Sequence, residues 1–171
     1  MVPSFPCQLR VCEDVVSAMD YLHRVHQPKV IHRDLKPQNI LVDCAGRAYL
    51  ADFGIARLSE RTFLNTANYA MGTLNYMAPE LFGSGEWVDE KCDVYSFGMI
   101  AYEMFTGLVP WKDAQPMQLA MKVGIERCRP DIPSDCPERY RALITLCWVR
   151  FFDKLPIKRP LLEVCNYERP V

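Results

Sequence analysis

The sequence predicts a mainly α-helical (α+β) fold with one small β-hairpin. Three stretches, 7–26, 90–106 and 138–148, carry apolar residues at the i, i+3, i+4 spacing of amphipathic or buried helices. Two short β-prone segments, 40–42 and 48–50, flank a turn at 43–46. Of the 171 residues, 50% are hydrophobic, which is enough to bury the core of about one domain.

The first helix is predicted over residues 7–26, because its apolar side chains recur at helical spacing and Pro28 follows its end. Seven residues form this apolar face: Leu9, Cys12, Val15, Val16, Met19, Leu22 and Val25. Residues 29–31 are short and β-prone, and the hairpin follows them. Residues 55–77 are polar and irregular, so no regular element is expected there.

The second half of the chain is predicted to be helical. Gly107 closes the helix at 90–106, since glycine readily takes the left-handed backbone that ends helices. Two further helices are expected at 116–123 and 138–148. Prolines at positions 130, 133 and 137 mark the loop between them.

Charge and cysteine content argue against several classes of function. The net charge is −1 and no long basic run occurs, so neither nucleic acid nor an anionic membrane is indicated as a partner. No segment approaches the roughly 18 apolar residues of a membrane span, and the N-terminus lacks the features of a signal peptide. The eight cysteines form no C-x-x-C pair. We interpret them as reduced thiols of an intracellular, cytoplasmic protein, with a disulfide framework as the alternative.

Three motifs follow one another in the first half of the chain. His32-Arg33-Asp34-Leu35 continues to Asn39 as H-R-D-L-x-x-x-N, Asp52-Phe53-Gly54 is D-F-G, and residues 78–80 are A-P-E. This ordered set is typical of protein kinases. The chain therefore resembles the C-terminal lobe of the protein-kinase fold over almost its whole length. The resemblance makes residues 1–171 a partial kinase domain, with a catalytic loop at 32–39 and an activation segment at 52–80.

The resemblance implies ATP and Mg²⁺ as cofactors and gives each motif residue a role. Asp34 accepts the proton of the attacking hydroxyl, and Lys36 places its charge on the transferred phosphoryl group. Asn39 and Asp52 hold the Mg²⁺ ions that bridge the phosphates, through the oxygen ligands that this cation prefers. Leu41 would form the floor of the adenine pocket.

Other positions resemble the supporting and regulatory residues of the family. His32 and Phe53 resemble the lower half of a hydrophobic column that aligns the two lobes, and Gly54 completes the D-F-G motif. Arg33 resembles the residue that binds a phosphate on the activation segment. Thr73 resembles a threonine that contacts both Lys36 and Asp34.

The resemblance also implies two buried polar interactions. Glu80 and Arg159 resemble an ion pair, although the run from 149 to 158 is about four residues longer than the family spacing. Asp93 resembles the aspartate that binds the backbone of the catalytic loop. An aspartate at a helix N-terminus is equally a good cap, and the sequence leaves both interpretations open.

Specificity is indicated by residues next to the motifs. Lys36-Pro37 and Gly72-Thr73 follow the serine/threonine pattern, so a serine or threonine of a protein would be the substrate. Cys147-Trp148 and residues 107–111 resemble the tyrosine-kinase-like group within that class.

The 171 residues contain no G-x-G-x-x-G loop and no V-A-I-K lysine, so we expect the N-terminal lobe to be absent. Two functions follow. The first is a serine/threonine protein kinase, here as a fragment that is inactive alone. The alternative is a catalytically inactive lobe that acts as a protein-binding module. In either case a partner protein could cover the apolar upper face around Leu41.

Overall fold

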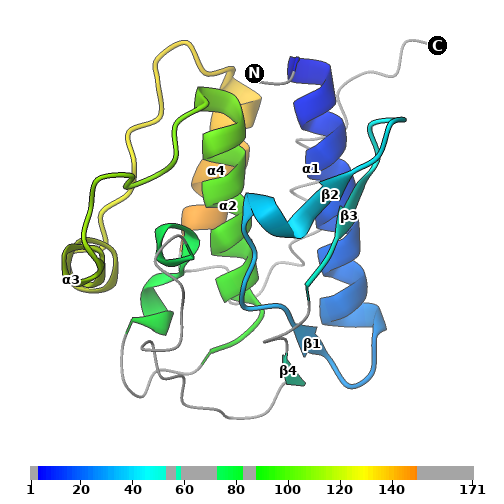
Figure 1. Ribbon diagram of the computed structural model, residues 1–171, viewed down its shortest axis with the longest axis horizontal. Coiled ribbons are helices and arrows are strands. Elements are labelled where there is room, and N and C mark those ends of the chain that lie inside the picture. Colours follow the sequence, from blue (N-terminus) through cyan, green and yellow to red (C-terminus); the bar gives the residue numbers. More distant parts are fainter. Residues whose placement is uncertain (1–3, 53–56, 59–72, 83–87, 150–171) are drawn as a thin grey trace.

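The computed structural model describes residues 4–52, 57–58, 73–82 and 88–149, and the following account is limited to these. A central helix, α2 (Lys91–Thr106), packs against α4 (Glu138–Trp148) and α1 (Phe5–Asp20). Figure 1 shows α2 in the middle of the molecule, with α1 beside it and α3 at the opposite margin. The predicted mainly helical fold with a small hairpin is confirmed.

Helix α1 begins at Phe5, two residues before the predicted start, and continues as a π-helical turn over Tyr21–Val25 (η1). Its buried face contains Cys12, Val15, Val16 and Met19, as the spacing predicted. The prediction that Val25 continues this face was wrong, because Val25 is 61% exposed. A π turn contains more residues than an α turn, so it rotates the following side chains away from the 3.6-residue stripe. As a result, His23 is the buried residue of this turn.

The hairpin consists of β2 (Ile40–Val42) and β3 (Ala48–Leu50), with the bounds that the sequence predicted. The strands pair antiparallel, with Leu41 opposite Tyr49 and Val42 opposite Ala48. Leu41 and Tyr49 share one face of the hairpin and both are exposed, whereas Ala48 on the other face is buried. Asp14 of α1 fixes the hairpin by accepting a hydrogen bond from the Ala48 N–H at 2.9 Å.

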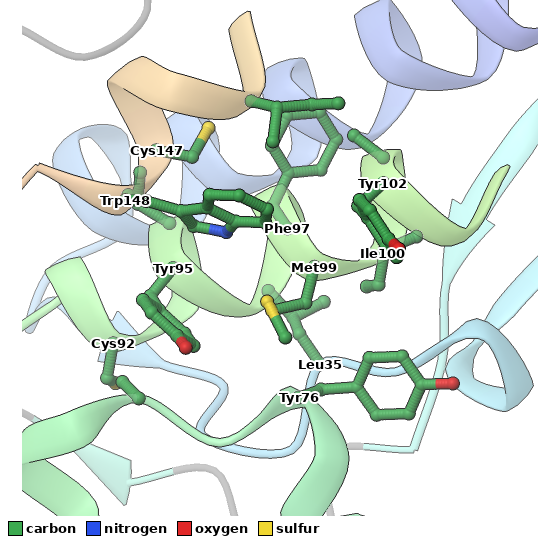
Figure 2. Packing of buried hydrophobic residues seen from close by; sticks show 14 of the residues in the cluster. Leu35, Tyr76, Cys92, Tyr95, Phe97, Met99, Ile100, Tyr102, Cys147 and Trp148 are labelled. Carbon is green, nitrogen blue, oxygen red and sulfur yellow. The ribbon is translucent and has the colours of Figure 1, made fainter. Parts of the chain in front are cut away.

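Helices α2 and α4 meet at a glycine. A Cβ atom at Gly98 would lie only 2.6 Å from the Cβ of Cys147, so only glycine permits this close approach. In Figure 2 the Trp148 indole lies beside Phe97 and Cys147, and all three are buried. Leu35 extends from the catalytic loop into the same core, near Met99 and Tyr76 in this view. The core therefore holds the loop that carries the H-R-D motif.

Shorter elements surround this core. Strand β1 (Val30–Ile31) pairs with β4 (Arg57–Leu58), a pairing that the sequence did not predict. Single 3₁₀ turns occur at Pro37–Asn39 (η2), Leu74–Tyr76 (η4) and Pro79–Leu81 (η5). Helix α3 (Pro116–Leu119) continues as a π-helical segment, Ala120–Ile125 (η6). Gly107 ends α2 with a φ of 70°, as predicted.

Two further observations concern the cysteines and the helices. None of the seven described cysteines is in a disulfide, and Cys12, Cys92, Cys136 and Cys147 are buried. Burial raises the pKa of the Cys92 thiol well above its ordinary value, and the neighbouring Asp93 carboxylate adds to this shift. Among the described helices, none has the length and apolar character that crossing a bilayer requires.

Candidate active site

The catalytic loop is fixed to α2 by one buried carboxylate. Asp93 is fully buried, and its Oδ2 accepts the backbone N–H of His32 at 2.8 Å. Its Oδ1 accepts the backbone N–H of Arg33 at 2.7 Å. Helix α2 is preceded by Glu90 at its N-cap position, so Asp93 lies within the first turn and is not the cap. Of the two interpretations that the sequence left open, the contact with the catalytic loop is the one observed.

Two motif residues have an unusual backbone conformation. Arg33 has a φ of 67° and Asp52 has a φ of 60°, both in the left-handed region. Non-glycine residues in this region cost energy and occur mainly where surrounding contacts hold them, often at functional sites. At Arg33 the holding contact is the hydrogen bond to Asp93. This backbone turn directs the next residue, Asp34.

The two oxygens of the Asp34 carboxylate have different surroundings. Its Oδ2 accepts hydrogen bonds from the Lys36 ammonium at 2.8 Å and from the Asn39 amide nitrogen at 3.3 Å. Its Oδ1 is buried and has no hydrogen-bond partner among the described residues. A buried carboxylate oxygen without a partner can accept a proton or a hydrogen bond from a bound hydroxyl group. The predicted proton acceptor therefore has one atom free for that purpose.

Asn39 is oriented so that its amide oxygen is available to a metal ion. The amide nitrogen donates to the Asp34 backbone oxygen at 2.7 Å as well as to the carboxylate. The other end of the amide group is then an oxygen acceptor, the ligand type that Mg²⁺ prefers. Asn39 itself is buried, and it lies on the 3₁₀ turn that leads directly into β2.

Backbone hydrogen bonds hold Asp52 next to this group. The Ala51 N–H donates to the Asn39 carbonyl at 2.9 Å, and the Ala51 carbonyl accepts from His32 Nε2 at 3.1 Å. Because His32 Nε2 donates, its Nδ1 is the acceptor for the Asp34 N–H at 3.4 Å. Asp52 follows Ala51 directly, and its side chain is exposed. Asp52 thus offers an exposed carboxylate one residue along the chain from the backbone contacts that Ala51 makes with His32 and Asn39, and carboxylate oxygen is a ligand that Mg²⁺ prefers.

No group of three His, Cys, Asp or Glu side chains suited to a metal occurs in the part of the chain that the structure describes. Magnesium usually takes only one or two carboxylates from the protein and completes its shell with water and phosphate oxygens. An all-protein cage, as expected for zinc, would need more ligands.

Lys36 also links the catalytic loop to residues much later in the chain. Its ammonium group donates to Thr73 Oγ1 at 3.1 Å as well as to Asp34, and Thr73 is buried. The ammonium therefore lies between Thr73 and Asp34. Three residues after Thr73, the hydroxyl of Tyr76 donates to Glu103 of α2 at 2.5 Å. Burial raises the pKa of Tyr76, and the Glu103 carboxylate raises it further, so the phenol remains a donor.

The guanidinium group of Arg33 is buried, and none of its three nitrogens has a hydrogen-bond partner among the described residues. A buried cation without a partner is costly, so this position favours an anion. The side chain thus has the electrostatic character expected of a phosphate-binding residue.

The remaining predicted positions are divided between described and undescribed parts. Leu41 is 57% exposed on the outer face of the hairpin. Glu80 lies in η5 and is half-buried. Phe53, Gly54 and Arg159 lie outside the described residues, so the Glu80–Arg159 pair stays a prediction. Sequence reasoning missed His23, whose Nε2 lies 2.7 Å from Asp93 Oδ2. No local signal marks His23, because the helix carries several other polar residues.

The geometry agrees with comparisons to known proteins. A model of the protein kinase domain matches residues 7–160, so the chain belongs to the protein kinase family. Its resemblance to serine/threonine kinases is confirmed by several relatives. It is 42% identical over 141 residues to the probable serine/threonine-protein kinase SIS8 of Arabidopsis thaliana, covering 82% of this chain and 13% of that protein.

Two other relatives give the same result. The serine/threonine-protein kinase CTR1 of Arabidopsis thaliana is 40% identical over 153 residues, which is 90% of this chain and 18% of that protein. A probable LIM domain-containing serine/threonine-protein kinase of Dictyostelium discoideum is 39% identical over 160 residues, or 93% of this chain and 23% of that protein. The chain thus spans less than a quarter of the length of each of these relatives.

Proposed function

We propose that this chain carries the phosphoryl-transfer machinery of a serine/threonine protein kinase. The observation that carries the proposal is the Asp34 carboxylate. Lys36 and Asn39 bind one of its oxygens, and the other is buried and has no hydrogen-bond partner within the described parts of the chain. Phosphoryl transfer depends on positioning and on charge neutralisation more than on covalent chemistry. Asp34 Oδ1 accepts the proton of a substrate hydroxyl while the Lys36 ammonium stabilises the charge on the transferred group.

Mg·ATP is the cofactor that these residues fit. The Asn39 amide oxygen and the Asp52 carboxylate would hold the metal, which neutralises phosphate charge when it is bound. The hydrogen bonds from Asn39 to Asp34 keep the amide oxygen directed away from the carboxylate. Leu41, exposed on the hairpin that follows Asn39, would contact the adenine.

The choice of serine and threonine rests on the contact between Lys36 and Thr73. The 3.1 Å hydrogen bond ties the catalytic loop to the segment that precedes the A-P-E motif. We assign a protein serine or threonine as the substrate. We also assign an intracellular location, which is in line with the described cysteines being outside any disulfide.

Residues 1–171 correspond, on this proposal, to the C-terminal lobe of the kinase domain. They include no G-x-G-x-x-G loop to cover the phosphates. The 171-residue chain by itself should therefore bind Mg·ATP with a dissociation constant above about 1 mM and should be inactive. Calorimetric titration of the isolated chain with Mg·ATP measures this directly, and a low-micromolar constant would overturn the assignment to one lobe.

The activity itself is tested in the full-length gene product that contains these residues. Transfer of labelled phosphate from ATP to a serine or threonine peptide is expected, and it should require Mg²⁺. A full-length protein that binds Mg·ATP yet transfers no phosphate to any peptide in a degenerate library would contradict the proposal.

Arg33 supports a regulatory site in the same machinery. Its three guanidinium nitrogens, which have no hydrogen-bond partner among the residues that the structure describes, would bind a phosphate carried by the activation segment, within residues 52–80. The candidate hydroxyls, Ser59, Thr62, Thr66 and Tyr69, lie outside the described residues. Mass spectrometry of the active protein would identify the phosphorylated position, if any.

A protein-binding module is the second candidate function. It is favoured by the outer face of the hairpin, where Leu41 and Tyr49 are 57% and 55% exposed and lie directly opposite each other. Exposed apolar pairs of this kind are suited to contact with another protein. An intact full-length protein that binds no nucleotide but captures a partner through this face would favour the module over the enzyme.

A further inference from the structure

We propose that Arg129 is a positioning residue for the segment 73–82, which begins beside the proton acceptor. Its guanidinium group fixes the end of η6 to α2 and α4, and η6 in turn supports the A-P-E turn, η5. The consequence for substrate binding rests on the proposed function, whereas the contacts of Arg129 do not depend on it.

The Arg129 guanidinium group contacts three parts of the chain. Its Nη1 donates to the backbone carbonyls of Arg127 at 3.1 Å and of Cys128 at 2.9 Å. Its Nη2 donates to the carbonyl of Trp148, the last residue of α4, at 3.4 Å. The guanidinium carbon also lies 4.8 Å from the centroid of the Tyr95 ring, which belongs to α2. One side chain therefore joins the loop after η6 to two core helices.

The surroundings of this side chain favour arginine. The last carbonyls of a helix have no partner within the helix, and a cation there also offsets the helix dipole. Burial raises the pKa of the Tyr95 phenol to about 12, so the ring stays uncharged and can present its π face to the cation. Figure 2 shows Tyr95 and Trp148 next to each other, where one guanidinium group can contact both. A lysine ammonium lacks the planar fork of donors that binds several carbonyls at once.

The loop that Arg129 holds contains a backbone conformation that needs support. Arg127 has a φ of 57°, in the left-handed region that is costly for residues other than glycine. Its carbonyl is one of the acceptors of Arg129, and the next N–H, of Cys128, donates to the Lys122 carbonyl in η6 at 2.7 Å. Because this hydrogen bond ties the loop to η6, Arg129 sets the position of the end of η6 relative to α2 and α4.

The segment η6 packs directly against η5. A Cβ atom at Gly124 of η6 would lie 3.0 Å from the Cβ of Phe82 and 3.8 Å from the Pro79 carbonyl oxygen. Pro79 is the first residue of η5 and Phe82 is its C-cap. With no side chain at Gly124, the backbone of η6 supports this turn closely. A displacement of η6 therefore either moves η5 or leaves a gap beneath it, and close-packed interiors do not tolerate gaps well.

The supported segment extends back to the catalytic loop. At its start, Thr73 Oγ1 accepts a hydrogen bond from the Lys36 ammonium, which also donates to Asp34. Thr73 is thus separated from the proton acceptor by a single ammonium group. A peptide whose hydroxyl reaches Asp34 Oδ1 brings its neighbouring residues alongside the segment 73–82. Displacement of this segment should weaken peptide binding, whereas the proposed metal ligands belong to other elements, so binding of Mg·ATP should change less.

Two substitutions of Arg129 and one matched control test the proposal. Arg129→Met removes the charge and the donors but keeps most of the aliphatic stem. Arg129→Lys keeps the charge, yet its ammonium cannot replace the bonds to both the loop and α4. Arg127→Met is the control, because the Arg127 side chain is exposed and makes no interaction among those that the structure describes.

Amide hydrogen exchange of the full-length gene product is the first measurement, followed by mass spectrometry. The amides of Leu81 and Phe82 donate hydrogen bonds to carbonyls within residues 78–79 and report on η5. In Arg129→Met their exchange should accelerate about tenfold relative to the amides of β2 and β3, with a smaller acceleration in Arg129→Lys. Arg127→Met should leave the ratio close to wild type. No acceleration, or an equal acceleration in the hairpin, would overturn the proposal.

Kinetics of the full-length protein provide the second measurement. Arg129→Met should raise the KM for a peptide substrate about tenfold and Arg129→Lys about threefold, while kcat and the KM for ATP change by less than about twofold. If Arg129→Met does not fold, the lysine variant decides the question, and an unchanged peptide KM overturns the proposal. If the exchange ratios respond as expected but wild type transfers no phosphate, the positioning role stands and the proposed function fails. If wild type is active and both variants keep the wild-type peptide KM, the role in substrate binding is wrong.

Discussion

Gly98→Ala should destabilise the protein, although alanine is the better helix former. The added Cβ would lie 2.6 Å from Cys147 Cβ and 2.8 Å from Trp148 Nε1. Carbon atoms in contact prefer about 3.5–4.0 Å, so α2 and α4 would have to separate by about 1 Å. Cys147 Cβ is bonded to the α4 backbone and cannot rotate away. Rearrangement of the Trp148 ring is also restricted, since this residue is buried.

The expected size follows from two opposing terms. Overpacking of a close-packed core costs about 1–3 kcal/mol, whereas replacing glycine by alanine inside a helix gains about 1 kcal/mol. Because the closest atom, Cys147 Cβ, is bonded directly to the α4 backbone and cannot rotate away, the cost should fall in the upper half of its range. The net loss in the free energy of unfolding should then be about 1–2 kcal/mol.

Urea unfolding followed by far-UV circular dichroism measures the change. The companion variant is Cys147→Gly, which removes the opposing Cβ. In a double-mutant cycle the pair Gly98→Ala and Cys147→Gly should be less destabilised than the sum of the two single variants, by about 1 kcal/mol. A Gly98→Ala variant as stable as wild type, or an additive double mutant, would refute the close-contact explanation.

Three further predictions concern the site, the pH dependence and the surface. In the full-length protein, Asp34→Asn should lower kcat by about 10²–10⁴-fold while Mg·ATP binding by calorimetry stays near wild type, because the shape remains and the proton acceptor is lost; near-full peptide phosphorylation would contradict the role of Asp34. Burial alone would raise the pKa of Glu90, but a backbone hydrogen bond and the Lys29 ammonium outweigh it and lower the pKa below its ordinary 4.5. The ion pair therefore stabilises the fold above that pH and is lost as the pH falls through the lowered pKa, so the stability difference between wild type and Lys29→Met, from urea unfolding, should shrink on acidification; a constant difference would argue against the pair. The isolated chain should bind a hydrophobic dye through Leu41 and Tyr49, and Tyr49→Lys should reduce the dye fluorescence and the concentration-dependent sedimentation; an unchanged signal would show that the hairpin is not the exposed patch.

Local sequence signals were sufficient to predict the elements whose bounds are set by turn residues and helical spacing within the element itself. The hairpin strands and α4 have the bounds predicted from turn residues and helical spacing, and Gly107 ends α2 as expected. The short β1–β4 ladder was missed because two-residue strands carry almost no pattern. Their pairing depends on a contact between segments distant in sequence. The π turn at Tyr21–Val25 was missed for a different reason, since periodicity assumes that the helical repeat stays constant.

In the candidate site, too, some features could be predicted from the sequence and others required the structure. The motifs located Asp34, Lys36 and Asn39, and the structure brings their side chains within hydrogen-bonding distance. Sequence alone could not decide whether Asp93 caps a helix or binds the loop, because both functions require the same residue type at a helix N-terminus. The decision needed the positions of the two N–H groups from residues 32 and 33, about sixty residues earlier.

Those N–H groups also explain why a buried carboxylate is retained at this place. Replacing Asp93 by an apolar residue would avoid a desolvation cost, but it would leave two consecutive buried N–H groups without acceptors. The left-handed backbone of Arg33 would then lose the contact that holds it, and the direction of Asp34 would no longer be fixed. We therefore expect the polar cluster of His23, Asp93 and the catalytic loop to contribute more to the accuracy of the site than to the stability of the fold. On this argument, variants of the cluster should lose kcat before they lose structure.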